Sequence, residues 1–247
     1  MMVLKHIPLE KAFNVRDMGG IVNREGKALK WQKLIRSDGV ANLTKQDWDT
    51  LYKVGVRTIL DLRGPSENKE FPDQPPQEIV HISCPLQEED FDIRNSSEGA
   101  AAAFQKSLLN SYTDMLFKTP YLLAKALCTL TDALENGAVL FHCTAGKDRT
   151  GTLAAAVLVL LGFDDPDIIA DYQISRTYNR NGIDKFVETL PNAADFKTAM
   201  ESNPETMMDT LEAMHQVDFA ALMAGNGFSE EKLEKLKALL LTDIDSL

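Results

Sequence analysis

Cysteine is scarce in this chain, whose 247 residues include only Cys84, Cys128 and Cys143. An odd number of widely spaced cysteines argues against a disulfide framework. Four histidines are present, yet neither H-x-x-x-H nor C-x-x-C occurs, and zinc sites commonly use these spacings. We therefore expect no metal site and no cofactor.

Long hydrophobic runs are also lacking. The longest, residues 153–161, is too short to cross a bilayer as a helix. The first residues, MMVLKHIPLEKAF, contain neither the apolar core nor the small-residue cleavage site of a signal peptide. The sequence thus predicts a cytoplasmic protein without stable membrane insertion, and leaves open secretion by a route that needs no signal peptide.

Positive charge is outnumbered, with 26 Lys and Arg against 37 Asp and Glu and a net charge of −11. A nucleic-acid-binding protein normally presents a basic face, and docking on anionic lipid by charge needs a basic cluster. We expect no nucleic-acid partner, and the oligomeric state stays open. A small anionic substrate is compatible with this charge because the field in a pocket depends on its local groups.

What the chain does contain is an alternation of strand-like and helix-like segments. A helix is expected over residues 43–55, with Thr44 as N-cap and Asp47 at the capping-box position. Further helices are expected over residues 119–137, 150–163 and 165–182, and strands over residues 31–37, 56–62, 78–84 and 138–142. Such alternation predicts an α/β fold with a central, mostly parallel sheet flanked by helices.

No repeat or obvious linker interrupts the chain, so we expect one domain over residues 1–247. After Gly182 the sequence predicts no strand, only short helices followed by an amphipathic helix over residues 229–241. Residues 183–215, or residues 87–112, are candidates for a helical lid over a site. The alternative is that both segments are ordinary packed helices.

The most informative stretch is AVLFHCTAGKDRTG, residues 138–151, in which an apolar run ends at a cysteine and a polar loop opens a helix. Unpaired N–H groups at a helix start, together with a turn that Gly146 allows, can converge on a tetrahedral anion. Arg149 adds a planar fork for two of its oxygens. These surroundings favour the thiolate of Cys143, which can attack a bound phosphate in line.

Two neighbours are placed to support this chemistry. Thr150 can hydrogen-bond the sulfur of Cys143, and His142 can fix the Cys143 backbone from behind. Taken alone, a cysteine at a strand end is usually an inert small hydrophobe. The combined spacing His-Cys-x5-Arg-Thr, with its glycine and helix start, is much more specific.

The loop HCTAGKDRTG resembles the signature of the cysteine-dependent protein-tyrosine-phosphatase superfamily. The segments NVRDMGG (residues 14–20), KLIRSDGVANLT (residues 33–44) and VRTILDLRGPSE (residues 56–67) are similar to those of atypical tyrosine and lipid phosphatases of bacteria and fungi. This resemblance implies the tyrosine-phosphatase fold. It also implies a phosphoric monoester hydrolase of the protein-tyrosine or dual-specificity type, which acts through a phosphocysteine on phosphotyrosine protein, phosphoinositides or both.

The resemblance also implies roles for the loop residues. Cys143 is the expected nucleophile and Arg149 the clamp on the transition state. Phosphate is bound by the backbone amides of residues 144–149, including Thr144, Ala145 and Gly146. Lys147 is either a second cation on the rim, which meets a second phosphate or an acidic substrate group, or a solvated lysine.

The proton donor for the leaving oxygen is harder to place, because the chain has no Trp-Pro-Asp tripeptide. Asp61 ends a predicted strand, where α/β active sites form, and the resemblance favours it. A turn cap or an ion pair with Arg63 is the alternative for Asp61. Asp148, inside the loop, is the second candidate, and Asp171, on the following helix, is the third.

Arg16, Asp17 and Arg36 also recur in the resembling segments. We interpret residues 14–20 as a turn that holds the edge of the sheet rather than as part of the site.

Two other functions stay open at this point. One is a catalytically silent module that binds phosphate or phosphoinositide, and the other is a sulfur transferase or arsenate reductase with the same type of cysteine loop. The joint presence of Cys143 and Arg149 favours catalysis, because binding alone needs no nucleophile.

Overall fold

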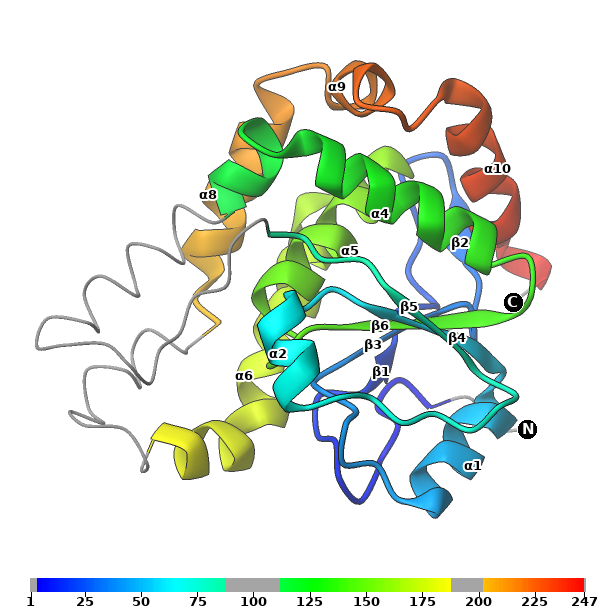
Figure 1. Ribbon diagram of the computed structural model, residues 1–247. Helices are drawn as coiled ribbons and strands as arrows, with labels where there is room; N and C mark the ends of the chain where they lie inside the picture. Colours follow the sequence, from blue (N-terminus) through cyan, green and yellow to red (C-terminus); the bar gives the residue numbers. More distant parts are fainter. Residues whose placement is uncertain (1–3, 88–111, 188–201, 247) are drawn as a thin grey trace, which may run out of the picture.

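The computed structural model describes residues 4–87, 112–187 and 202–246, with the backbone alone for residues 181–187 (Figure 1). Its central sheet has five strands in the order β1-β3-β6-β4-β5. The last four run parallel, and β1 pairs antiparallel with β3 at one edge. The strands are β1 Arg16–Asp17, β3 Leu34–Ser37, β4 Val56–Asp61, β5 Val80–Ser83 and β6 Ala138–His142. The predicted α/β fold with a mostly parallel sheet is confirmed.

The middle strand, β6, is buried along its whole length, as its unbroken apolar sequence predicts. Its last residue, His142, pairs with Ser37 of β3 on one side and with Asp61 of β4 on the other. The parallel strands therefore end along one edge of the sheet. The loops that follow them converge there, which is where ligand sites of open α/β sheets form.

One face of the sheet is covered by α1 (Lys45–Val54), which lies below the sheet in Figure 1. Ile59 and Leu140 belong to the apolar cluster on this face. The helix begins at the predicted capping box, in which Thr44 accepts from the Asp47 N–H and the Asp47 carboxylate accepts from the Thr44 N–H. This local signal places the start of α1 at the residue that the sequence indicates.

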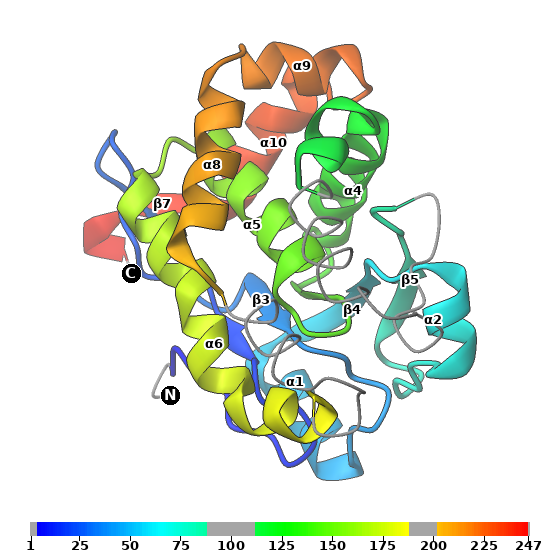
Figure 2. The ribbon, with the colours of Figure 1, turned by 90° about the vertical axis from the view of Figure 1, so that its left-hand side faces the viewer.

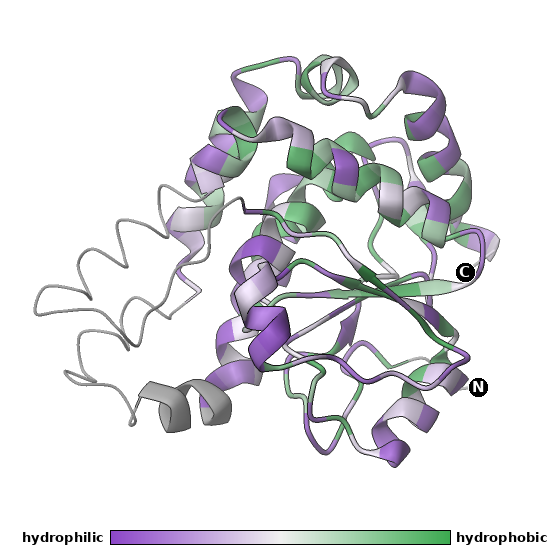
Figure 3. Cartoon of the chain, in the orientation of Figure 1, coloured by the Kyte–Doolittle hydropathy of each residue, from purple (hydrophilic) through white to green (hydrophobic). Residues whose placement is uncertain are grey.

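The opposite face carries a second apolar cluster, which includes Leu60 and Phe141. The helices that contribute to it include α4 (Pro120–Ala133), α5 (Asp148–Leu160) and α6 (Asp165–Val187), together with helices of the C-terminal part. Figure 2 shows α5 between α4 and α6, and Figure 3 shows that much of α5 is hydrophobic. Because α5 is buried between these helices, the position of its first turn relative to the end of β6 is fixed.

The C-terminal part contains a strand that the sequence did not predict. This strand, β7 (Leu241–Asp243), pairs antiparallel with β2 (Lys27–Leu29). Each has only three residues, too few for a periodic pattern to stand out. The end of α6 was also predicted wrongly, because the helix runs through Gly182 to Val187. A glycine within a helix costs only about 1 kcal/mol relative to alanine.

The remaining elements are helical: α2 (Pro65–Glu70), α8 (Pro204–His215), α9 (Phe219–Gly225), α10 (Glu230–Leu240) and the short turn η2 (Ile244–Ser246). The amphipathic helix predicted over residues 229–241 is α10. No helix in the described ranges is long and apolar enough to cross a membrane.

Both predicted lid segments lie partly outside the described residues, which exclude 88–111 and 188–201. The described end of the second segment is α8, which packs on α6 and buries Met207, Leu211 and Met214. This helix is packed against the rest of the chain, and the lid stays a prediction.

Candidate active site

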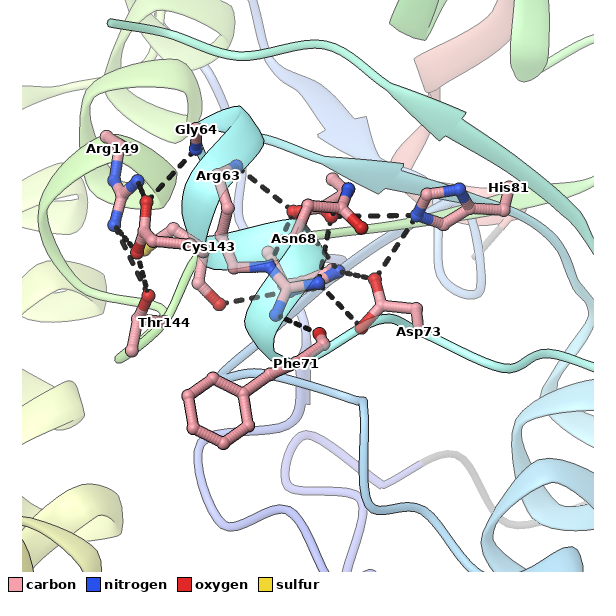
Figure 4. Close-up of polar contacts among 12 residues, drawn as sticks. Arg63, Gly64, Asn68, Phe71, Asp73, His81, Cys143, Thr144 and Arg149 are labelled. Atoms are coloured by element: carbon pink, nitrogen blue, oxygen red, sulfur yellow. Dashed lines mark hydrogen bonds and ion pairs between the residues drawn. The ribbon is translucent and has the colours of Figure 1, made fainter. Parts of the chain in front are cut away.

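The cysteine loop joins the middle strand of the sheet to the buried helix α5. Cys143 directly follows β6 and is only 2% exposed, and α5 begins at Asp148. The loop between them lies at the carboxyl edge of the sheet. Figure 4 shows Cys143 beside Thr144 and Arg149, next to the turn that carries Gly64.

Two asparagine side chains hold carbonyl groups of this loop. The Asn14 Nδ2 donates to the oxygens of Ala145, at 3.0 Å, and Gly146, at 3.1 Å. The Asn179 Nδ2, from α6, donates to the same Ala145 oxygen at 2.6 Å. Residues more than thirty positions away on either side of the loop thus orient its peptide groups.

The neighbouring carbonyls are held as well. Gly39 N–H donates to the Thr144 oxygen at 3.0 Å, and Gly151 N–H donates to the Lys147 oxygen at 2.7 Å. The Arg36 Nη2 donates to the Gly146 oxygen at 2.9 Å. Every carbonyl from residue 144 to residue 147 therefore has a donor.

The N–H groups of the same loop are used differently. Among the described residues, those of Thr144, Ala145 and Gly146 donate no hydrogen bond. The first turn of α5 adds further N–H groups that lack partners within the helix. Peptide donors gathered at a helix start form a site for a tetrahedral oxyanion.

Gly146 is required by this backbone shape. Its φ is +63°, in the left-handed region, and a Cβ atom there would lie 2.2 Å from the Ser37 carbonyl oxygen. No side chain fits so close to the end of β3. The predicted role of this glycine in the turn is confirmed.

The Arg149 guanidinium forms an ion pair with Glu67, a residue of α2 that the sequence did not single out. Its Nη1 lies 2.5 Å from Glu67 Oε2 and its Nη2 lies 2.9 Å from Oε1 (Figure 4). Gly64 N–H and the Thr144 hydroxyl also donate to this carboxylate. Burial alone would raise the pKa of Glu67, but the bonds and charge of Arg149 lower it to about 2. The carboxylate of Glu67 therefore fixes the orientation of the Arg149 guanidinium.

Asp61 is fully buried and is paired with Arg63. The Arg63 Nε lies 2.8 Å from Oδ1 and its Nη2 lies 2.9 Å from Oδ2, and the Asn68 Nδ2 donates to Oδ2 at 2.7 Å. Burial opposes the charge, but His81 and Arg63 hold the pKa of Asp61 well below its ordinary value. This is the ion pair that the sequence offered as the alternative to an acid role.

His142 contacts the backbone of Cys143, as predicted. Its Nδ1 lies 3.0 Å from the Cys143 carbonyl oxygen, and its Nε2 lies 2.9 Å from Asp73 Oδ2. Both partners offer acceptor oxygens, so a ring N–H can donate to either of them. The imidazole is thereby fixed behind Cys143.

Potential ligand atoms of Asp61, Asp73 and His142 lie within 4.8 Å of one another. Arg63 Nη2 stands 2.8 Å from Asp73 Oδ1 and also pairs with Asp61. A metal ion here would have to displace the guanidinium. The donor set fits a network of ion pairs better than a cation site.

Asp148 opens α5 and remains accessible, with 20% of its side chain exposed. The hydroxyl of Tyr112 lies 2.5 Å from its Oδ1, and the Lys147 Nζ lies 3.5 Å from the same oxygen. Its other oxygen has no hydrogen-bond partner among the described residues. This carboxyl lies within the cysteine loop itself.

Asp171 is placed differently, between two buried arginines. Arg16 Nε lies 2.9 Å from its Oδ1, and Arg36 Nη1 lies 2.5 Å from its Oδ2. Burial would raise the pKa of Asp171, but these two arginines hold it well below the ordinary value. Because Arg36 also binds the loop, our interpretation that residues 14–20 only hold the sheet edge is incomplete. Asn14 and this arginine network support the loop directly.

Two details of the sequence prediction are wrong. Lys147 is neither on an exposed rim nor solvated, since it is 3% exposed and its ammonium turns toward Asp148. Thr150 is fully buried, and its hydroxyl has no hydrogen-bond partner in the described residues, so the predicted bond to the Cys143 sulfur is not formed. Spacing placed both residues next to the loop but did not fix their side-chain rotamers.

The residues that sequence reasoning missed are Asn14, Glu67, Asp73, Tyr112 and Asn179. Asn14 and Glu67 lie within segments quoted for the resemblance, so a weak signal existed for them. The other three stand in no motif and reach the site only through the fold.

Known proteins provide an independent comparison. A model of the tyrosine phosphatase family matches residues 7–242. A Cupriavidus necator protein that bears a tyrosine-protein phosphatase name is 30% identical over 174 residues, which cover 67% of this chain and 61% of that protein. A tyrosine-protein phosphatase of Nostoc commune is 32% identical over 155 residues, covering 61% and 51%. The triple specificity protein phosphatase PtpB of Mycobacterium tuberculosis is 29% identical over 195 residues, covering 69% and 68%.

The matched part of the chain spans between about half and two thirds of the length of these relatives. The family match itself covers nearly the whole chain and includes the loop, its supporting asparagines and Glu67. The chain therefore belongs to the tyrosine phosphatase family.

Proposed function

We propose that this chain is a cysteine-dependent phosphomonoester hydrolase that acts through a phosphocysteine intermediate. The observation that carries the proposal is the peptide orientation of residues 144–147, whose carbonyls are all held by donors. A loop held in this way offers its N–H groups to an anion without reorganising during the reaction. Membership of the tyrosine phosphatase family supports the same conclusion.

The reaction follows from the placement of three groups. The Cys143 thiolate attacks phosphorus, the ester P–O bond breaks, and the leaving oxygen takes a proton from a carboxylic acid. Arg149 and the loop amides stabilise the charge on the equatorial oxygens. Water then attacks the phosphocysteine and gives a proton back to the carboxylate. The S–P bond breaks, inorganic phosphate is released and the Cys143 thiolate is restored.

Asp148 is the carboxyl that best fits the role of acid. Asp61 and Asp171 are each paired with arginine, and an arginine partner favours the ionised form. Asp148 instead is partly exposed and has no arginine partner in the described residues: its cationic neighbour, Lys147, lies 3.5 Å from Oδ1, and its other oxygen lacks a described partner. We propose Asp148 as the general acid and assign Asp61 to the ion-pair network behind the loop.

Replacement of Asp148 by Asn tests this assignment. We expect kcat/KM on alkyl phosphates to fall by about 10²–10³-fold, and by much less on aryl phosphates whose leaving groups need no proton. The measurement is kcat/KM across a series of leaving groups. The same pattern in Asp61→Asn, with no such pattern in Asp148→Asn, would return the role to Asp61.

Phosphotyrosine protein is the substrate that we propose first, with phosphoinositide headgroups as the second. The lipid headgroup stands second because Lys147, the second cation of the loop, is buried rather than exposed on the rim. Phosphate release from a phosphotyrosine peptide, a phosphoserine peptide and a phosphoinositide set should be compared for wild type and Cys143→Ser, in EDTA and reductant. Release that disappears in the variant supports the proposal, and the order of rates selects protein or lipid.

The same assay separates the rival functions. Binding of vanadate or phosphate without release from any substrate would favour a phosphate-binding module. Turnover of thiosulfate or arsenate in place of phosphoesters would favour a sulfur transferase or an arsenate reductase.

A further inference from the structure

Tyr112 is a buried residue outside the cysteine loop that contacts the proposed acid. It lies at the start of helical residues 112–117 and is 2% exposed, yet its hydroxyl lies 2.5 Å from Asp148 Oδ1. Burial and the charge of Asp148 raise the pKa of Tyr112 well above its ordinary value. The phenol thus keeps its proton throughout the range in which enzymes are assayed.

The direction of the hydrogen bonds follows from this. An ionised carboxylate can only accept, so Tyr112 donates to Asp148. The Tyr172 hydroxyl, 3.1 Å from that of Tyr112, must then donate to it. Two hydroxyl groups therefore lead from α6 to one oxygen of the acid.

The α6 end of this pair of hydroxyl groups is rigid. Tyr172 lies on α6 and is 1% exposed, and its ring stands edge-on to that of Tyr112 with centroids 6.5 Å apart. It also packs against α5 at Gly151, where a Cβ atom would lie 3.1 Å from the ring. Tyr112 is held in place by a partner that contacts the helix of the acid itself.

We infer that Tyr112 is a positioning residue that reserves one oxygen of Asp148 for proton transfer to the leaving group. Because Tyr112 donates to Oδ1, the proton of the neutral carboxyl resides on Oδ2, the oxygen without a described partner. Without this bond the carboxyl can rotate, and its proton can point away from the leaving oxygen. The inference rests on the proposed function and adds a residue that neither motif nor spacing identifies.

The test is Tyr112→Phe, measured as kcat/KM over aryl and alkyl phosphates. We expect a loss of about tenfold or more on poor leaving groups and of less than about threefold on good ones, because only the former need the acid. In the Asp148→Asn background, Tyr112→Phe should add no further dependence on the leaving group. Tyr52→Phe removes a hydroxyl from an exposed tyrosine of α1 and serves as the matched control, with unchanged kinetics.

Two results would overturn the inference and leave Tyr112 a packing residue. One is a fall in kcat/KM that is equal for aryl and alkyl phosphates. The other is that Tyr112→Phe lowers kcat/KM in the Asp148→Asn background as much as it does in wild type. Thermal unfolding and vanadate binding establish that the variant folds with an intact loop. If Tyr112→Phe does not fold, Tyr172→Phe removes the donor to Tyr112 and must show the same leaving-group dependence in weaker form. Phosphate release that persists in Cys143→Ser would instead overturn the proposed function.

Discussion

At the scale of single residues, the loop depends on positions where only one residue type fits. Gly146 combines a left-handed backbone with a contact that leaves no room for a Cβ atom beside Ser37. The strain of a side chain there would be relieved only by moving the loop. Since the proposed anion site consists of the N–H groups of the loop, a shift in this backbone removes the geometry on which the proposed chemistry depends.

Gly146→Ala should therefore abolish phosphate release and weaken vanadate binding, while reducing the free energy of unfolding by about 1–3 kcal/mol. Gly225→Ala is the matched control. It lies in α9, where a Cβ atom meets nothing within 4 Å, so we expect normal activity and unchanged or slightly higher stability. Full activity in Gly146→Ala, measured by phosphate release, would contradict the rigid-loop description.

At the scale of elements, the loop is held by partners from separate parts of the chain. Asn14 precedes β1, Arg36 lies on β3 and Asn179 lies on α6, and all three donate to loop carbonyls. Asp171 connects α6 to Arg36 and Arg16 through buried ion pairs. The position of α6 against the sheet edge is thus coupled to the shape of the site.

Asn14→Asp tests this coupling, because it replaces a donor to two carbonyls with a carboxylate that repels them. We expect kcat/KM to fall by about 100-fold and stability to fall by about 1–3 kcal/mol, from the loss of buried hydrogen bonds. Asn226→Asp is the matched control. It removes a similar hydrogen bond, from the Asn226 side chain to the Leu222 oxygen, at the end of α9. Kinetic constants that change equally in the two variants would show that Asn14 has no special role.

At the scale of the whole molecule, a buried cluster of charges joins the ends of the central strands. Arg63 pairs with Asp61 and Asp73, and His81 Nε2 lies 3.3 Å from Asp73 and 3.6 Å from Asp61 (Figure 4). Contact with these two carboxylates raises the pKa of His81 to about 9. The charge on His81 therefore contributes to the stability of the fold through the assay range.

The sign of this contribution is fixed by the raised pKa. It is fully present below about pH 6.5, the ordinary value for histidine, and it is lost as the pH rises through about 9. We expect wild type to lose about 1–2 kcal/mol over this interval, after allowance for the partial exposure of His81. Urea unfolding at both ends of the interval should show that His81→Gln loses most of this difference. A variant that kept the full pH dependence would place its origin elsewhere.

The sequence predicts those parts of the fold that short segments encode. The capping box of α1, the unbroken apolar strand β6 and the loop around Cys143 are each contained within about a dozen residues, and each was located correctly. The pairing of β2 with β7 joins segments more than two hundred residues apart, and no local pattern indicates it.

The same distinction holds within the site. Cys143, Gly146 and Arg149 are identified by their spacing alone. The partners of Arg149 and Asp148, which are Glu67 and Tyr112, depend on how α2 and residues 112–117 pack, and sequence spacing does not encode this. For Asp61 the sequence indicates both the strand-end position and a pairing with Arg63 as one of its alternatives, and the structure shows that the pairing is formed.

The central claim is that a phosphoryl group passes through Cys143, and acid quenching during turnover tests it most directly. Wild type mixed with a phosphotyrosine peptide is quenched within the first turnovers, digested and analysed by mass spectrometry. The account predicts a mass gain of one phosphoryl group on the peptide that carries Cys143, lost when excess time allows hydrolysis and absent in Cys143→Ser. Phosphate release with no such adduct, or release that continues in Cys143→Ser, would contradict it.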